Sequence, residues 1–382
     1  MKKILVIGAG NIGKAITDLL TADGFYEVTL ADVTAASLAG IPPHPRLHAA
    51  TLDARDPDGL CSALQGKFAV VSAVPYHLTV PIAHAAVAAK VHYLDLTEDV
   101  GSTRQIKTLA QAASSALIPQ CGLAPGFISI VAHHLTAGFD RVDSVRLRTG
   151  ALPQYPANAL KYNLTWSTDG VINEYCEPCE AIANGRRVEV PALEECEEFS
   201  LDGVSYEAFN TSGGLGTLCD SLQGHVQTLN YRSIRYPGHA ALMKALLHDL
   251  RLGERRELLK EILEYAVPTT LQDVVIIVVI ISGLQRGRLT QETYANKVYG
   301  QVINGKPMRA IQATTAAGIC TALDLLANRR LPQQGLICQE HIALPEFLAN
   351  RFGAVYTSGS TQHQYPMPAS AIPSERQMDG QA

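Results

Sequence analysis

The stretch KKILVIGAGNIG, residues 2–13, joins a short apolar run to three closely spaced glycines. Ile4–Ile7 predict a buried strand, and the next segment, NIGKAITDLLTA, has the apolar spacing of an amphipathic helix. A G-x-G-x-x-G run alone is weak evidence. Between a strand and a helix, with Asp32 ending a second strand about 20 residues later, it predicts a dinucleotide-binding turn.

Each glycine of this turn has its own physical role. Gly8 permits the tight turn, Gly10 lets a pyrophosphate approach the backbone, and Gly13 lets the helix pack closely on the strand. The backbone amides of Asn11 and Ile12 face the phosphates from the first turn of the helix. These residues are therefore the predicted phosphate-binding set.

Two carboxylates follow at the ends of the next strands. We expect Asp32 to accept hydrogen bonds from the adenosine ribose hydroxyls. Its charge repels a 2′-phosphate, and residues 33–35 (VTA) supply no arginine to bind one, so the sequence favours NAD over NADP. Asp53 either contacts the adenine or is an ordinary loop carboxylate.

The composition excludes several classes of partner. The chain has 382 residues, 47% of them hydrophobic and 18% charged, with a net charge of −5. Because it lacks a clustered basic face, we expect no nucleic-acid partner. The N-terminal apolar run is too short for a signal peptide, and no run reaches the roughly 18 residues of a membrane span, so we expect a cytoplasmic protein without a membrane partner. The CxxC pair Cys176 and Cys179 has no second pair at zinc-ligand spacing, so no metal is predicted.

Strand and helix signals alternate through residues 1–126, which predicts an α/β Rossmann domain with a doubly wound parallel sheet. From residue 127 hairpin-like spacing predicts an α+β second domain with a mostly antiparallel sheet, extending to residue 325. The run VVIIVVII within it predicts a strand buried on both faces. We expect residues 326–353 to pack back on the first domain and residues 354–382 to form a disordered tail.

Six motifs in series resemble the saccharopine dehydrogenase-like reductases, and within them most closely the lysine 6-dehydrogenases. They are GAGNIG, SAVPYH, YLDLTED, CGLAPGF, TSGG and IRYPGH. The resemblance covers residues 1 to about 350. It implies an NAD(P)-dependent oxidoreductase that acts on a carbon–nitrogen bond of an amino acid, usually as a homodimer. Ligands of such sheets lie beyond the carboxyl ends of the strands, where we expect Val74, Pro75 and Gly122 at the cofactor.

An amino-acid substrate explains the stretch RSIRYPGH, residues 232–239. Arg235 is expected to hold the substrate carboxylate with two hydrogen bonds, which a lysine cannot do. His239 then supplies a second polar contact or carries a proton. Alternatively, both residues pair with carboxylates between the domains. Tyr162 and Trp166 are expected to line the pocket roof and Thr211, in the TSGG motif, to bind substrate.

Oxidation of an ammonium-bearing carbon needs a base near the nicotinamide. Asp95 is the first choice, because it ends a strand of the cofactor sheet, where burial raises a carboxyl pKa. Tyr76, His77 and His239 are the alternatives. Glu98 and Asp99 either add acidity that suits a cationic amine or begin the next helix.

The resulting expectation is an NAD-dependent L-lysine 6-dehydrogenase, which oxidatively deaminates the ε-carbon to 2-aminoadipate 6-semialdehyde. An alternative within the family is a saccharopine or carboxynorspermidine dehydrogenase, which runs a reductive condensation. An alternative of another class is a non-catalytic NAD(H)-binding regulator that senses redox state.

Overall fold

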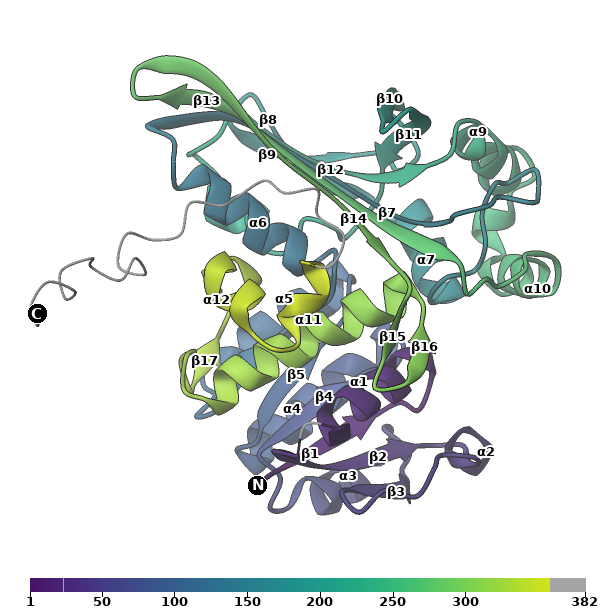
Figure 1. The fold of residues 1–382 in the computed structure, drawn as a ribbon, viewed down its shortest axis with the longest axis vertical. Coiled ribbons are helices and arrows are strands. Elements are labelled where there is room, and N and C mark those ends of the chain that lie inside the picture. The colour runs from purple at the N-terminus through teal and green to yellow at the C-terminus, as the bar shows by residue number, and fades with distance from the viewer. Residues whose placement is uncertain (23, 358–382) are drawn as a thin grey trace, which may run out of the picture.

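The first domain is an open sheet in the lower half of Figure 1. The computed structural model of the protein describes residues 1–22 and 24–357. The strands of this sheet are Lys2–Ile7 (β1), Tyr26–Asp32 (β2), Leu47–Thr51 (β3), Ala69–Ser72 (β4), His92–Asp95 (β5), Ala116–Ile118 (β6) and Gly335–Leu336 (β17). In the described part of the chain these seven strands pair in parallel in the order β17-β6-β5-β4-β1-β2-β3.

Helices cover both faces of this sheet. They are Asn11–Ala22 (α1), Ala35–Leu38 (α2), Pro57–Leu64 (α3), Thr79–Ala89 (α4), Val100–Ala110 (α5) and Ala310–Ala327 (α11), with a 3-10 helix at Tyr76–Leu78 (η1). Ile4 and Val6 of β1 pack in the core that contains residues of α1 and α11. Leu5 and Ile7 pack on the other face with residues of α3, α4 and α5. The apolar run of β1 is therefore buried on both sides, and the predicted doubly wound sheet is confirmed.

The second domain is built on a larger sheet. Its strands are Arg141–Pro153 (β7), Cys179–Ala183 (β8), Arg186–Val190 (β9), Glu197–Leu201 (β10), Val204–Asn210 (β11), Thr228–Arg235 (β12), Asp273–Gln285 (β13) and Arg288–Tyr299 (β14). The main order is β10-β11-β12-β7-β13-β14, and β8 and β9 extend it beside β12. The β12–β7 pair is parallel and the other described pairs are antiparallel. The predicted, mostly antiparallel sheet is confirmed.

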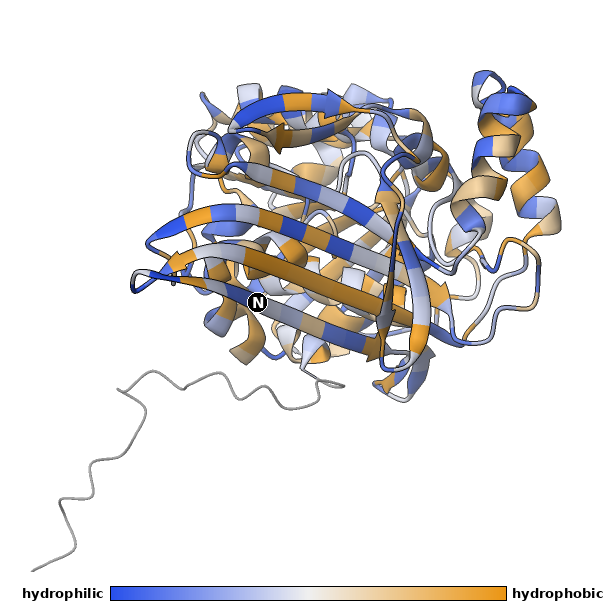
Figure 2. Ribbon diagram, turned by 90° about the horizontal axis from the view of Figure 1, so that it is seen from above, coloured by the Kyte–Doolittle hydropathy of each residue, from blue (hydrophilic) through white to orange (hydrophobic). Residues whose placement is uncertain are grey.

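Strand β13 forms the hydrophobic spine of this sheet. Figure 2 shows it as a continuous apolar band, seen from the side turned away from the first domain. Alternate residues of 275–281 are buried in the main core, and alternate residues of 274–278 are buried on the opposite face. This two-sided burial accounts for the apolar run VVIIVVII.

The remaining helices lie in two groups. Phe127–Thr136 (α6) and Leu344–Ala349 (α12) lie with α11 between the two sheets, and Thr168–Cys176 (α7), His239–Lys244 (α9) and Arg256–Ala266 (α10) lie at one end of the large sheet (Figure 1). The shorter elements are Leu218–Leu222 (α8), Ala245–Asp249 (η2), Leu252–Glu254 (η3), Gln339–His341 (η4) and Gly353–Tyr356 (η5), with a hairpin of Gln301–Ile303 (β15) and Lys306–Met308 (β16). The end group has its own apolar core, to which α7, α9 and α10 contribute.

The chain returns to the first domain earlier than predicted. The predicted second domain runs to residue 325, but α11 packs against α1, with Sγ of Cys320 4.0 Å from the Ile16 carbonyl oxygen. Strand β17 then pairs with β6 at the edge of the parallel sheet. By length and composition α11 is the one described helix that could cross a membrane, but 83% of that stretch is buried in this fold.

The disordered tail is predicted to begin at residue 354, but residues 354–356 belong to the ordered 3-10 helix η5. Tyr356 is buried, its ring stacks on Phe127 with 3.9 Å between the centroids, and its hydroxyl donates to the Thr314 carbonyl oxygen at 2.8 Å. These contacts hold η5 in the core between the sheets. The remainder of the predicted tail, 358–382, lies outside the described residues.

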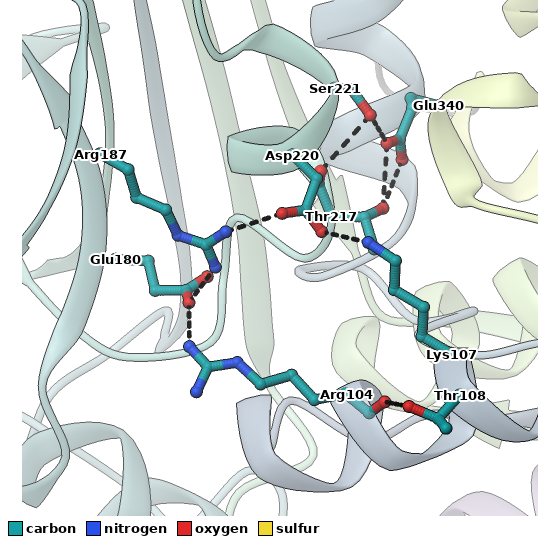
Figure 3. A network of polar contacts seen from close by, with 9 residues as sticks. All are labelled: Arg104, Lys107, Thr108, Glu180, Arg187, Thr217, Asp220, Ser221 and Glu340. Atoms are coloured by element: carbon teal, nitrogen blue, oxygen red, sulfur yellow. Dashed lines mark hydrogen bonds and ion pairs between the residues drawn. The ribbon is translucent and has the colours of Figure 1, made fainter.

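A network of ion pairs joins the two domains, as Figure 3 shows. Arg104 on α5 pairs with Glu180 on β8 at 2.8 Å. Lys107, one turn further along α5, pairs with Asp220 on α8 at 2.9 Å. Arg187 contacts both acids from within the second domain. The network helps to fix α5 of the first domain against the second.

Candidate active site

The glycine turn after β1 has the shape that a dinucleotide needs. A Cβ atom at Gly8 would lie 2.4 Å from a carbonyl oxygen, and one at Gly13 would lie 1.8 Å from the Gly8 carbonyl oxygen. A Cβ at Gly10 would meet no atom within 4 Å. The open space therefore lies before α1, where Asn11 and Ile12 begin the helix and their amides point outward. The predicted phosphate-binding residues fit the group.

The carboxylate of Asp32 lies beside this turn. Its Oδ2 accepts a hydrogen bond from the Ala9 amide at 2.8 Å, and its Oδ1 accepts one from the Thr34 amide at 2.9 Å. Asp53 has a different environment, because its two oxygens accept from Arg55 at 3.0 and 2.8 Å. These hydrogen bonds lower the pKa of Asp53. The carboxylate of Asp53 thus pairs with its neighbour Arg55 at the surface, and both of its predicted alternatives, an adenine contact or an ordinary loop carboxylate, stay predictions.

A cavity of about 270 Å³ lies between the two domains, next to the glycine turn. Seven of the residues predicted for the site line it: Ile12, Val74, Pro75, Tyr76, Gly122, Trp166 and Arg235. Four others, Asp95, Tyr162, Thr211 and His239, are buried behind its walls. The sequence therefore predicted residues at this cavity, but it did not distinguish those that line the cavity from those that are buried behind its walls.

Arg235 ends β12 and brings a buried positive charge to the cavity, since only 3% of the residue is exposed. Its Nε donates to the Tyr175 hydroxyl at 2.9 Å, and its Nη1 donates to the Ile234 carbonyl oxygen at 2.8 Å. No carboxylate among residues 1–22 and 24–357 forms an ion pair with it. A buried cation without a charged partner is costly, so the arrangement suits an anionic group of a ligand.

His239 lies behind Arg235 rather than at the cavity. Its Nδ1 is 2.8 Å from the Leu160 carbonyl oxygen, which can only accept, so Nδ1 carries the proton. Its Nε2 is 3.1 Å from the Tyr175 hydroxyl. Burial, and then the charge of Arg235, lower the pKa of His239 to about 3. A neutral imidazole with both nitrogens engaged orients Tyr175, and the predicted proton carrier is therefore corrected to a positioning residue.

Tyr162 and Thr211 also act through neighbours. The Tyr162 ring lies under the Arg235 guanidinium at 5.1 Å and beside the His239 ring at 5.4 Å. The Thr211 hydroxyl is 2.8 Å from that of Ser233, which lines the cavity. Both predicted substrate contacts become supports of the wall.

Asp95 does not reach the cavity, which removes the geometric basis for its predicted role as the base. It is 1% exposed and accepts a hydrogen bond from the Tyr93 hydroxyl at 2.8 Å. The backbone amides of Thr97 and Gln120 donate to it at 3.0 and 2.9 Å. Burial raises the pKa of Asp95 to about 6, although the hydrogen bonds oppose this change. The side chain ties the ends of β5 and β6 together and so supports the cavity wall.

The cavity lining contains three carboxyl groups and one cation. The acids are Glu98, Asp169 and Glu174, and Arg235 is the cation among the described lining residues. Asp169 pairs with Lys260 at 2.7 Å. Sequence reasoning gave Glu98 two alternatives and missed Glu174, because nothing local marks a glutamate inside the helical segment INEYCEP as part of a site.

Family models match both domains. The model described as "Saccharopine dehydrogenase NADP binding domain" matches residues 4–118. The model described as "Saccharopine dehydrogenase C-terminal domain" matches residues 122–353. The first match supports a nicotinamide dinucleotide cofactor at the glycine turn.

Two curated relatives are identical to this chain at about a quarter of the aligned positions. Mitochondrial alpha-aminoadipic semialdehyde synthase of Bos taurus is 23% identical over 347 residues, which are 87% of this chain and 36% of that protein. Saccharopine dehydrogenase [NADP(+), L-glutamate-forming] of Saccharomyces cerevisiae is 25% identical over 183 residues, 45% of this chain and 40% of that protein. The chain thus spans less than half the length of these relatives. The solved apo structure of saccharopine dehydrogenase (L-Glu forming) from Saccharomyces cerevisiae superimposes with a TM-score of 0.73 at 17% identity, covering 93% of this chain and 96% of that chain, and it shows the shared fold.

Proposed function

The chain belongs to the saccharopine dehydrogenase family, and from this premise we propose that it is an NAD-dependent L-lysine 6-dehydrogenase. In this reaction the ε-carbon of lysine loses a hydride and its nitrogen becomes an imine. Water then releases ammonia and leaves 2-aminoadipate 6-semialdehyde, which can cyclise. The resemblance of the motif series to lysine 6-dehydrogenases motivates the choice within the family.

The charge of the cavity lining is the observation that carries this proposal. Arg235 is one cation beside three acids, Glu98, Asp169 and Glu174. Asp169 is already paired with Lys260, so Arg235, Glu98 and Glu174 are left to match the one carboxylate and two amines of lysine. Saccharopine carries the carboxylates of both lysine and glutamate, and each of them needs a cation or several donors when it is buried. The lining supports the diamine more than the polycarboxylate.

The size of the cavity points the same way. Pockets for drug-sized ligands span roughly 300–1,000 Å³, and this cavity measures about 270 Å³. Ile12 and Gly122, beside the cofactor turn, also line it, so part of its volume belongs to the cofactor. A compact substrate is therefore favoured.

The cofactor would be held by Gly8, Gly10 and the first amides of α1, with Asp32 at the adenosine ribose. When bound, the nicotinamide ring supplies the hydride acceptor. Asp32 disfavours a 2′-phosphate, and the exposed Val33 offers no cation, which supports NAD. The family model is nevertheless named for NADP, so the preference must be measured.

A substrate screen tests the proposal. Purified protein is incubated with L-lysine, saccharopine, cadaverine or other diamines, each with NAD and with NADP, and reduced nicotinamide is read by absorbance. We expect the highest kcat/KM with L-lysine and NAD. Turnover of saccharopine alone would reassign the protein within the family. Tight NAD binding without turnover of any amine would instead indicate the redox regulator.

A further inference from the structure

Glu98 and Glu174 come from different domains and meet at helix α7. Glu98 follows β5 in the first domain, and Glu174 is on α7 in the second. A Cβ atom at Gly170 would lie 3.1 Å from Oε1 of Glu98, so the Glu98 carboxyl rests against α7 at this glycine. Gly170 and Glu174 are four residues apart on the helix and share a face, so Glu174 extends from the same face of α7 that the Glu98 carboxyl contacts.

The backbone around these two acids is tightly packed across the domain boundary. A Cβ atom at Gly213 would lie 2.3 Å from the Glu98 carbonyl oxygen, so the second domain contacts the Glu98 main chain directly. The adjacent Ser212 amide donates to the Glu174 carbonyl oxygen at 3.0 Å. Both glutamates are thereby held in place at the cavity wall.

Glu174 lies within electrostatic reach of both Glu98 and Arg235. Burial is the main reason that the pKa of Glu174 is raised; the charge of Glu98 adds to it, and Arg235 opposes it. All three residues line the same cavity. In the described part of the chain, neither glutamate forms an ion pair. The cavity wall therefore carries a cation and two unpaired carboxyl groups.

The surroundings of Glu98 are acidic. Burial raises the pKa of Glu98 to about 7, and the charges of Asp99 and Asp95 act in the same direction. On α7, Asp169 faces the cavity, but it is paired with Lys260. A carboxyl group in this environment can gain and lose a proton near neutral pH.

We propose that these three side chains form a charge ladder for an α,ω-diamino acid, an inference that rests on the proposed function. Arg235 holds the α-carboxylate, Glu174 holds the neighbouring α-ammonium, and Glu98 receives the ω-amine that reacts. The order of charges in the protein then mirrors the order in the substrate.

The ladder also accounts for the proton. An N–H bond of the ω-ammonium breaks, an O–H bond forms on a carboxylate oxygen of Glu98, and the amine becomes neutral. The adjacent carbon then loses a hydrogen with its electron pair to the nicotinamide cofactor of the proposed function, and the nitrogen lone pair forms the iminium. Glu174 binds the α-ammonium, whose positive charge favours the ionised form of this buried carboxyl group.

The test combines two variants with a substrate that lacks one group. Glu98→Gln and Glu174→Gln keep the side-chain shape and remove the charge. Glu177→Gln is the matched control, because Glu177 follows the same helix but pairs with Arg256 at 2.7 Å. L-Lysine is compared with 6-aminohexanoate, which lacks only the α-amine. Melting temperatures of all variants are recorded.

Wild type should use 6-aminohexanoate about 10- to 100-fold less well than lysine, the scale of one charged hydrogen bond. Glu174→Gln should lower kcat/KM for lysine by a similar factor and leave that for 6-aminohexanoate unchanged. Glu98→Gln should lower kcat for both by about 100-fold or more. Wild type should lose kcat/KM below a pH of about 7, where Glu98 is protonated, and Glu98→Gln should abolish this pH dependence. Glu177→Gln should change none of these.

Equal losses for lysine and 6-aminohexanoate in Glu174→Gln would overturn the ladder and leave the proposed function intact. So would an unchanged pH profile in Glu98→Gln. Calorimetric titration of both ligands into the protein–NADH complex, which cannot accept a hydride, measures their binding without turnover. If wild type binds lysine but oxidises it with neither NAD nor NADP, the proposed function fails. The ladder then stands if Glu174→Gln lowers the affinity for lysine, and it is overturned if the affinity is unchanged. Absence of lysine binding overturns both.

Discussion

Arg235 and His239 are joined through one hydroxyl group, that of Tyr175. The Nε of Arg235 donates to this oxygen at 2.9 Å, and the oxygen lies 3.1 Å from Nε2 of His239. Because Nδ1 of His239 carries the proton, Nε2 is the acceptor and Tyr175 is the donor. The stretch RSIRYPGH therefore supplies both ends of a relay that orients the guanidinium toward the cavity.

Arg235→Lys should impair the use of substrates that have a carboxylate. An ammonium cannot reproduce a two-pronged contact, so kcat/KM for lysine should fall by about 1.5–3 kcal/mol of transition-state binding. Cadaverine, which lacks the carboxylate, is the control, and its rate should hardly change. An equal loss of kcat/KM for both substrates, together with a lower melting temperature, would instead show that Arg235 has a structural role between the domains.

His239 should make the protein sensitive to acid. The pKa of His239 is lowered to about 3 in the folded protein, so its contribution to stability is complete above its unfolded value and is lost as the pH falls. At pH 5 the loss amounts to about 2 kcal/mol relative to neutral pH, from an unfolded pKa of roughly 6.5. His239→Asn keeps a donor for the Leu160 carbonyl and removes this titration. Urea unfolding at pH 7 and pH 5 should show a smaller acid loss in the variant; the same loss in both proteins would contradict the assignment.

Asp273 should stabilise helix α11 from a distant strand. Its carboxylate is buried and accepts from the amides of Ala310 and Ile311 at 2.6 and 3.0 Å, which makes it the N-terminal cap of that helix. Asp273→Ala leaves two buried amides unpaired and should lower the free energy of unfolding by about 1–3 kcal/mol. Asp273→Asn, which retains one acceptor oxygen, should lose less. Chemical denaturation measures both, and a loss below about 0.5 kcal/mol in the alanine variant would count against the cap.

Cofactor preference should depend on Asp32 and the exposed Val33. Asp32→Ser combined with Val33→Arg removes the repulsive carboxylate and adds a partner for a 2′-phosphate, so the ratio of kcat/KM for NADP to that for NAD should rise. Initial rates with both cofactors check this. If wild type already prefers NADP, the interpretation of Asp32 is wrong.

Local sequence patterns were sufficient for the fold of both domains. The run Ile4–Ile7 is apolar at every position because β1 is buried on two faces, and its glycine turn leads directly into α1. The same reasoning held for the apolar run on β13. These features depend on strand pleat, helix period and backbone sterics, which a short segment carries in itself.

The candidate site depended on packing between segments that are far apart in the sequence. Asp95 could be placed at the end of a strand, but only the amides of Thr97 and Gln120 show that it points away from the cavity. Glu174 has no motif around it, and it joins the site because α7 meets the loop of Glu98 across the domain boundary. Residue type and spacing thus determined the sheets, the glycine turn and the arginine that lines the candidate site. Which carboxyl groups share the cavity with that arginine was decided by how the two domains pack, because side-chain direction and burial at an interface depend on both surfaces at once.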